Sequence, residues 1–125
     1  MRIYLAGWFG AQARLRAIRD TIHRMTPQHR VIATWLDEEG SGTPPPDEAM
    51  EYAIRDGGEI RWSELLILDT FDPDDRGGRE VEFGQAQGLG VPGWVVGPPR
   101  NIFHHLAPNF IAWDEAYRAL AKEDV

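Results

Sequence analysis

Residues 65–89 read LLILDTFDPDDRGGREVEFGQAQGL, and this stretch is the most informative one in the chain. The apolar run 65–68 is typical of a buried strand, and an acidic turn follows it over residues 69–75. Gly77 and Gly78 then open a segment that we expect to be a helix ending near Leu89. A strand that leads through a glycine turn into a helix presents free backbone N–H groups and the positive end of the helix dipole at the tip of a sheet. Such a tip can hold an anion or a sugar hydroxyl.

Strands and helices alternate on both sides of this stretch. We expect strands at residues 2–6, 30–36, 65–68, 93–96 and 110–113. We expect one helix over 11–26, a second that starts at residue 47, a third that follows the glycine turn and ends near 89, and a fourth from an N-cap at Asp114 through Lys122. The pattern predicts an α/β fold: a single-domain, three-layer sandwich with a mostly parallel five-stranded sheet, flavodoxin- or Rossmann-like. Ligands of such folds bind beyond the carboxyl ends of the strands.

The segment between the second and third strands contains two irregular features. Residues 37–46 form the longest loop, and long ordered loops in small domains often cover sites. A helix starts after the proline run 44–46, but Asp56, Gly57 and Gly58 interrupt its pattern. Each glycine costs a helix roughly 1 kcal/mol, so we expect a kink or break before Ile60.

Composition excludes several classes of function. The 125 residues suit one domain spanning the whole chain, and a net charge of −7 disfavours binding to nucleic acid backbones. The absence of cysteine excludes disulfides, thiolate zinc sites and a cysteine nucleophile. No apolar run reaches membrane-spanning length. We therefore expect a soluble, intracellular (cytoplasmic) protein without a membrane partner.

Three stretches together resemble the nucleoside 2-deoxyribosyltransferase family, which includes the related deoxynucleoside 5′-monophosphate N-glycosidases. They are IYLAG at 3–7, RGGREVEFGQA at 76–86, and VPGWVVG at 91–97 with NIFH at 101–104. The resemblance extends from Arg2 to about Trp113, and its most specific element is the Glu-x-Gly-x-Ala pattern that begins at Glu82. Enzymes of this family exchange or hydrolyse the bond between a base and 2-deoxyribose.

The resemblance implies roles for individual residues. Glu82 would be the nucleophile, Tyr4 would hydrogen-bond it, and Asp56 would be the acid/base. Asn101 lies where the family often supplies a polar residue from a neighbouring subunit, which implies a homodimer or larger assembly. The implied ligands are a nucleoside or nucleotide and a free base, with no metal and no cofactor.

The chain also departs from the family pattern. Trp8 replaces a residue that is usually small or proline, and Gly57-Gly58 follows Asp56 where helix is expected. Some relatives that act on 5′-monophosphates carry an arginine just after the first strand, whereas this chain has none between residue 10 and Arg14. Nucleoside and monophosphate therefore both stay open as substrates.

Candidate substrate-binding residues lie at the ends of the expected strands. Trp8 can stack on a base, Asp69 can reach the sugar, and the turn 76–79 can hold a 5′-hydroxyl or phosphate through backbone N–H groups and guanidinium. The full set is Gly7, Trp8, Asp69, Arg76, Gly77, Gly78, Arg79 and Asn101.

Each candidate also has a purely structural interpretation. Glu82 can be a helix N-terminal carboxylate, with Glu80 as a competitor for the functional role. Tyr4 can be a core tyrosine, Asp56 a turn residue, and 76–79 an ordinary basic turn. The acidic turn is more easily explained as solvated than as a divalent-ion site, and the pair His104-His105 as solvated or facing a subunit than as metal ligands.

Two functions remain from the sequence. The first is cleavage or exchange of the N-glycosidic bond of a 2′-deoxynucleoside or its 5′-monophosphate through a covalent glutamyl-deoxyribosyl intermediate, as a transferase or a hydrolase. The alternative is a non-catalytic nucleotide-binding or sensing module, which Trp8 and the glycine pair 57–58 favour.

Overall fold

The computed structural model describes residues 1–39, 44–74 and 76–123. Residues 40–43 of the predicted long loop and Asp75 of the acidic turn lie outside the described residues.

Five strands in the described part of the chain form one sheet with the order β2-β1-β3-β4-β5. They are β1 (Arg2–Ala6), β2 (Arg30–Val31), β3 (Leu65–Asp69), β4 (Gly93–Val96) and β5 (Asn109–Phe110). Every pair is parallel, so the predicted α/β fold is confirmed and the sheet is fully rather than mostly parallel. The chain leaves β1 toward β2 on one side and returns to β3 on the other. The carboxyl ends of β1 and β3 therefore flank the point where ligands bind in this topology.

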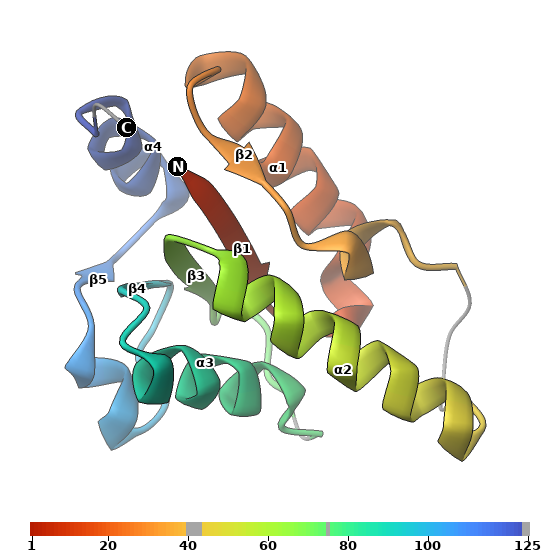
Figure 1. Ribbon diagram of the computed structural model, residues 1–125. Coiled ribbons are helices and arrows are strands. Elements are labelled where there is room, and N and C mark those ends of the chain that lie inside the picture. The colour runs from red at the N-terminus through yellow and green to blue at the C-terminus, as the bar shows by residue number, and fades with distance from the viewer. Residues whose placement is uncertain (40–43, 75, 124–125) are drawn as a thin grey trace.

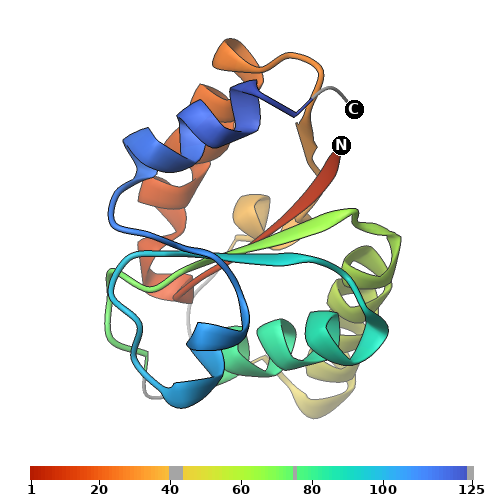
Figure 2. The ribbon, with the colours of Figure 1, turned by 90° about the vertical axis from the view of Figure 1, so that its left-hand side faces the viewer.

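Helices cover both faces of the sheet (Figures 1 and 2). α1 (Gln12–Met25) and α4 (Trp113–Ala121) pack on one face, and α2 (Pro46–Trp62) and α3 (Gly78–Leu89) pack side by side on the other. Three short 3-10 helices connect the described elements: η1 (Phe9–Ala11), η2 (Thr34–Asp37) and η3 (Ile102–Leu106). None of the helices in the described residues is both long enough and apolar enough to cross a membrane.

The two central strands explain the apolar runs in the sequence. All five residues of β3 are buried, as are four of the five in β1, because helices cover the sheet on both sides. Ile3, Leu5, Leu66 and Ile67 have no exposed surface. This rigid centre fixes Tyr4, whose side chain is also fully buried, relative to the helices above it.

The outer strands are shorter than predicted. β2 ends at Val31 because the chain turns into η2, where the buried Trp35 donates its indole N–H to the carbonyl oxygen of Leu5 at 2.8 Å. β5 ends at Phe110, and Trp113 begins α4 instead of ending a strand. Asp114 therefore lies in the first turn of α4, and the N-cap is Ala112. In each case a tryptophan that packs into the core was mistaken for part of a strand.

The predicted break in the second helix is wrong, since α2 continues through Gly57 and Gly58 to Trp62. Ile60 is fully buried beyond the glycines, and burying such a side chain contributes about 1.5–3 kcal/mol, enough to offset the local cost of glycine. Gly57 faces α3, where an added Cβ would lie 3.9 Å from the amide nitrogen of Gln85. That distance is an ordinary van der Waals contact, so the space between α2 and α3 at this position would also admit a Cβ.

The helix after the glycine turn agrees with the prediction. α3 begins at Gly78 and ends at Leu89, and Gly77 before it has a positive φ of 84°. Glycine adopts this left-handed conformation without the steric cost that other residues incur. The turn thereby directs the first turns of α3 toward the carboxyl ends of β1 and β3.

Candidate active site

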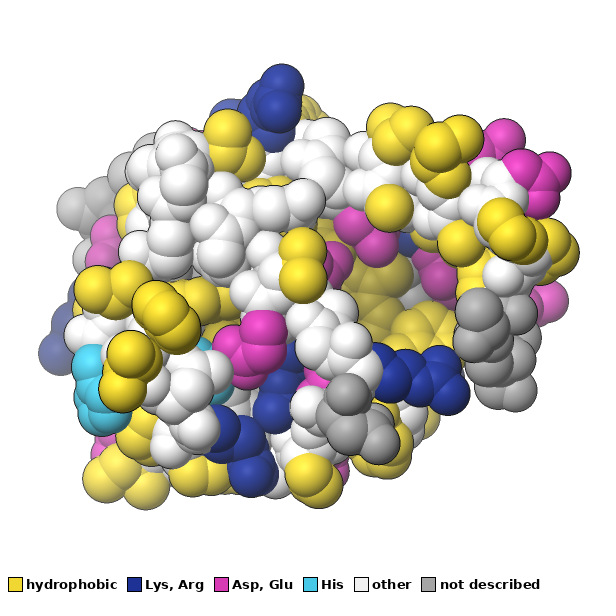
Figure 3. All heavy atoms as spheres, turned by 90° about the horizontal axis from the view of Figure 1, so that it is seen from below, with side chains coloured by type: hydrophobic (Ala, Val, Ile, Leu, Met, Phe, Trp, Pro, Cys, Tyr) yellow, Lys and Arg dark blue, Asp and Glu magenta, His cyan; other side chains and the backbone are white. Residues whose placement is uncertain are grey.

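A cavity of about 710 Å³ lies where α2 and α3 meet the loops that follow β1 and β3. Seen from below in Figure 3, the surface is hollowed, with hydrophobic side chains inside and carboxylates at the edge. The residues that line the cavity are Gly7, Trp8, Phe9, Gly10, Trp35, Glu38, Ala53, Asp56, Asp74, Arg76, Gly78, Arg79, Val81, Glu82 and Gln85.

Glu82 lines this cavity and is hydrogen-bonded to Tyr4, which is buried behind it. The hydroxyl of Tyr4 donates to Oε2 of Glu82 in a short hydrogen bond, so the contact that the resemblance predicts is present. Desolvation raises the pKa of Glu82 to about 8, the bond from Tyr4 opposes that rise, and the carboxylates of Asp56 and Asp74 add to it. Burial also raises the pKa of Tyr4 far above its usual range, which keeps the phenol protonated as a donor. The pair can therefore stabilise a carboxylate that its surroundings otherwise keep protonated.

Asp56 reaches the same cavity from α2. Burial raises the pKa of Asp56, against the effect of Arg55, which donates to its Oδ1 from Nη2 at 2.8 Å. Glu38 and Glu59 raise that pKa further because they add negative charge nearby. Asp56 can therefore hold a proton close to an ionisable Glu82, the arrangement that acid/base catalysis on two carboxyl groups needs.

Glu80, the competing carboxylate, has a structural partner instead. Its oxygens lie 2.9 and 3.0 Å from Nε2 of His104, and Nδ2 of Asn101 donates to it at 3.1 Å. The backbone N–H of Arg100 donates to Nδ1 of His104, so Nε2 carries the proton that binds Glu80. His104 has no exposed surface, so the expectation of a solvated or subunit-facing histidine is wrong for this residue. His105 is exposed.

Asn101 lies outside the cavity of its own chain. Its Oδ1 accepts from the backbone N–H groups of Phe103 and His104, which caps η3.

The glycine turn holds a carboxylate from its own loop. Oδ1 of Asp74 accepts from the backbone N–H of Arg76 at 3.0 Å and of Gly77 at 3.4 Å, and the Asp74 side chain is only 5% exposed. Arg79 is buried and donates from Nη1 to the carbonyl oxygen of Asp72 at 2.6 Å, so it braces the loop although it also lines the cavity. Arg76 and Gly78 contribute to the cavity wall, whereas Gly77 does not line it.

Asp69 is a structural residue in the described chain. It is 1% exposed, it pairs with Arg14 through two contacts of 2.9 Å, and it accepts from the indole N–H of Trp113 at 2.8 Å. It does not line the cavity. Among the described residues, no three histidine, aspartate or glutamate side chains gather in a way that would hold a metal ion.

Several solved structures share the fold of this protein over nearly the whole chain. A 2-deoxyribosyltransferase from the psychrotolerant bacterium Bacillus psychrosaccharolyticus matches with a TM-score of 0.75 at 19% identity, over 99% of this chain and 93% of that chain. This protein has the fold of a 2-deoxyribosyltransferase. The predicted likeness to that family is thereby confirmed at the level of the fold.

Two further structures have the same 2-deoxyribosyltransferase-like fold. One is a conserved protein from Enterococcus faecalis V583, with a TM-score of 0.73, 15% identity and 96% of each chain covered. The other is a CMP N-glycosidase from Clostridium botulinum, with a TM-score of 0.61 and 17% identity over 96% of this chain and 98% of that chain. No protein-family model matches the sequence, and no curated protein matches it significantly.

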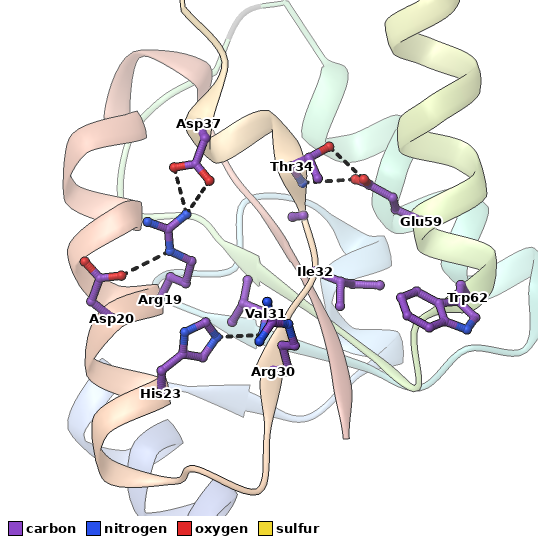
Figure 4. A pocket seen from close by; sticks show the side chains of 11 residues that line it. Arg19, Asp20, His23, Arg30, Val31, Ile32, Thr34, Asp37, Glu59 and Trp62 are labelled. Carbon is purple, nitrogen blue, oxygen red and sulfur yellow. Dashed lines mark hydrogen bonds and ion pairs between the residues drawn. The ribbon is translucent and has the colours of Figure 1, made fainter.

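A second hollow of about 670 Å³ lies at the edge of the sheet, beside β2 (Figure 4). Its polar side chains largely satisfy one another: Arg19 pairs with Asp37 at 2.8 Å, and Glu59 accepts from the Thr34 hydroxyl at 2.7 Å. His23 accepts from the backbone N–H of Val31 at 2.9 Å, so it covers the edge of the strand. These contacts serve the fold, and we take the cavity around Glu82 as the candidate active site.

The sequence left several lining residues of that site unassigned. Trp35 was assigned to a strand, and Glu38 lies in the long loop that was expected to cover a site, which was a usable signal. Asp74 was treated as one member of a solvated turn. The remaining unassigned residues are Phe9, Gly10, Ala53, Val81 and Gln85, which reach the cavity only through the packing of η1, α2 and α3.

Proposed function

We propose that this protein is an enzyme that cleaves or exchanges the N-glycosidic bond of a 2′-deoxynucleoside, with Glu82 as the nucleophile. The observation that carries the proposal is that Glu82 and Asp56 line one cavity and that the buried Tyr4 donates a hydrogen bond to Glu82. The shared fold with a 2-deoxyribosyltransferase and a CMP N-glycosidase supports the same class of chemistry.

The reaction balances with these groups alone. The ionised Glu82 attacks C1′, the bond from C1′ to the base nitrogen breaks, and its electron pair leaves with the base. Asp56 gives its proton to a ring nitrogen of the leaving base. Water or a second base then attacks C1′ of the glutamyl ester, which frees Glu82, and Asp56 recovers the proton. The choice between water and a base separates the hydrolase from the transferase.

The 5′ end of the substrate is proposed to carry a hydroxyl and not a phosphate. The backbone N–H groups of Arg76 and Gly77 already bind the carboxylate of Asp74, and a phosphate there would face that charge. A neutral 5′-hydroxyl can instead donate to Asp74. With 2′-deoxyadenosine and its 5′-monophosphate as a matched pair, we expect the nucleoside to have the higher kcat/KM.

The non-catalytic alternative has lost one of its two supports. The expected break at Gly57 and Gly58 is absent, and Asp56 is held in a continuous α2. Trp8, the other support, lines the cavity and is 38% exposed, which suits a stacking contact with a base in an enzyme equally well.

The direct test is turnover of 2′-deoxynucleosides, with and without a second free base, followed by chromatography of the products. Glu82→Ala is expected to lose activity by on the order of 10³-fold or more, because the nucleophile is gone. Glu80→Gln is the matched control, since Glu80 lies on the same helix but binds His104 outside the cavity. Turnover in Glu82→Ala equal to that of the unmodified protein would rule the mechanism out.

A further inference from the structure

One end of the cavity is lined by aromatic rings. Trp8 and Phe9 are each 38% exposed, and Phe9 packs against the buried Trp35 with ring centroids 5.9 Å apart. All three line the cavity. Flat apolar walls suit a flat heterocycle, so under the proposed function this end takes the base.

Two carboxyl groups beside these rings are held together by one guanidinium. Nη2 of Arg55 binds Oδ1 of Asp56 at 2.8 Å and makes a short contact with Oε1 of Glu38. Arg55 itself does not line the cavity, whereas Glu38 and Asp56 do. Their side chains are 18% and 23% exposed. In the described chain the other oxygen of each carboxyl, Oε2 of Glu38 and Oδ2 of Asp56, has no hydrogen-bond partner.

The two groups differ in what they can offer a base. Burial raises the pKa of Asp56, against the effect of Arg55, and the negative charge of Glu38 adds to the rise. In the proposed mechanism Asp56 carries the proton that the leaving base takes up. Asp56 is then a donor, and Glu38 is an acceptor beside it. A ligand that satisfies both must present an acceptor next to a donor.

We propose that Glu38 is a specificity-determining residue and that the cluster of Glu38, Arg55 and Asp56 selects bases with an exocyclic amino group beside an unprotonated ring nitrogen. Adenine, through N7 and its 6-amino group, and cytosine, through N3 and its 4-amino group, have this pattern. The inference rests on the proposed function, and it adds to that function the chemical class of the base.

Bases with a keto group do not have this pattern of an acceptor ring nitrogen beside a donor amino group. Hypoxanthine and guanine place a carbonyl oxygen where adenine has its amino group, and uracil and thymine do so relative to cytosine. That oxygen would face the carboxylate of Glu38, so two acceptors would meet without a proton between them. A site that binds an N–H group discriminates strongly against an analogue that lacks it, because its own polar atom is left unpaired.

Two pairs of substrates test this contact. 2′-Deoxyadenosine and 2′-deoxyinosine differ in an amino or keto group at C6 and in a proton on N1, while 2′-deoxycytidine and 2′-deoxyuridine differ in an amino or keto group at C4 and in a proton on N3. We expect kcat/KM to favour the amino member of each pair by about tenfold or more. Glu38→Gln, whose amide can donate to a keto oxygen, should reduce both preferences by about tenfold, mainly by improving the keto substrates.

Glu48→Gln is the matched control. It removes the same charge from the first turn of α2, where, among the described residues, Glu48 accepts a hydrogen bond from the hydroxyl of Tyr52 at 2.8 Å, outside the cavity. It should leave both preferences unchanged. Calorimetry with free adenine and hypoxanthine on the unmodified protein gives a second measurement that needs no variant, and adenine should bind more tightly.

The outcomes separate the two proposals. Turnover without a preference for amino bases, or a preference that survives in Glu38→Gln, overturns the inference and leaves the proposed function standing. Tighter binding of adenine without turnover of any nucleoside supports the inference and overturns the catalytic proposal. Neither turnover nor binding of any base overturns both.

Discussion

In the proposed mechanism Glu82 must lose a proton before it can attack C1′, and its surroundings oppose that loss. Its pKa of about 8 means that roughly a tenth of the protein carries an ionised Glu82 at pH 7. The hydroxyl of Tyr4 partly offsets this effect by stabilising the carboxylate. The catalytic proposal therefore predicts a particular dependence on pH.

The kcat/KM of the hydrolytic or transfer reaction should rise with pH up to about 8, because the ionised fraction of Glu82 rises through its pKa.

The stability of the fold should change with pH in the opposite direction. A carboxyl whose folded pKa lies above its ordinary value of 4.5 destabilises the fold progressively as pH rises from about 4.5 to about 8. Glu82→Gln should thus raise the free energy of unfolding at pH 9 by on the order of 2 kcal/mol, and hardly at pH 4, in urea titrations. A stability difference that is the same at both pH values would contradict this assignment.

Tyr4→Phe tests the partner of Glu82. Loss of the hydroxyl removes the interaction that lowers the pKa of Glu82, so the rise of kcat/KM should shift to higher pH. Activity at pH 7 should fall by about 10- to 100-fold, the cost of one hydrogen bond to a charged group. Kinetics across pH 6–10 measure both effects, and an unshifted profile would mean that Tyr4 only packs in the core.

At the scale of the elements, the structure depends on an α2 that continues through two glycines. Gly58 is exposed, and a Cβ added there meets no atom within 4 Å. The burial of Ile60 and the packing of α2 against α3 outweigh the low helix propensity of the two glycines, on which the predicted break was based.

Gly58→Ala should raise the free energy of unfolding by about 0.5–1 kcal/mol, because alanine loses less backbone entropy in a helix than glycine does. Activity should not change, since Gly58 does not line the cavity. Thermal or urea unfolding measures the effect, and a destabilised variant would show that residue 58 is not in unstrained helix.

Elements with a strong local signal were predictable, and those set by distant contacts were not. β1, β3, β4 and α3 follow from apolar runs and the glycine turn. The ends of β2 and β5 depend on where Trp35 and Trp113 pack, and a single sequence does not contain that information.

The candidate site divides in the same way. Tyr4, Asp56 and Glu82 could be named because they match a family pattern, and the structure brings them to one cavity or into contact with it. Asp74 could not, because its partner Glu82 comes from α3, and for Glu38 the long loop indicated a site without naming the residue, because its partner Arg55 comes from α2. Asp69 and Asn101 have polar side chains at strand ends, as binding residues do, but their hydrogen bonds serve the fold.

At the scale of the whole molecule, assembly is still a prediction. The resemblance implies a homodimer or larger assembly, and η3 with the residues after it exposes apolar side chains: Ile102 at 77%, Phe103 at 60%, Leu106 at 65% and Ile111 at 81%. Light scattering coupled to size exclusion should give at least twice the mass of one chain. Phe103→Glu should shift that mass toward the monomer if η3 lies in the contact, and a monomeric unmodified protein would contradict the prediction.

The central claim is a covalent bond between Glu82 and C1′ of the sugar, and intact-protein mass spectrometry after rapid acid quenching tests it most directly. During turnover of a 2′-deoxynucleoside, the protein should gain the mass of one 2-deoxyribosyl group, and peptide analysis should place it on Glu82. Glu80→Gln should give the same adduct, and Glu82→Gln should give none. Full turnover with no adduct, or with an adduct on another residue, would contradict the account.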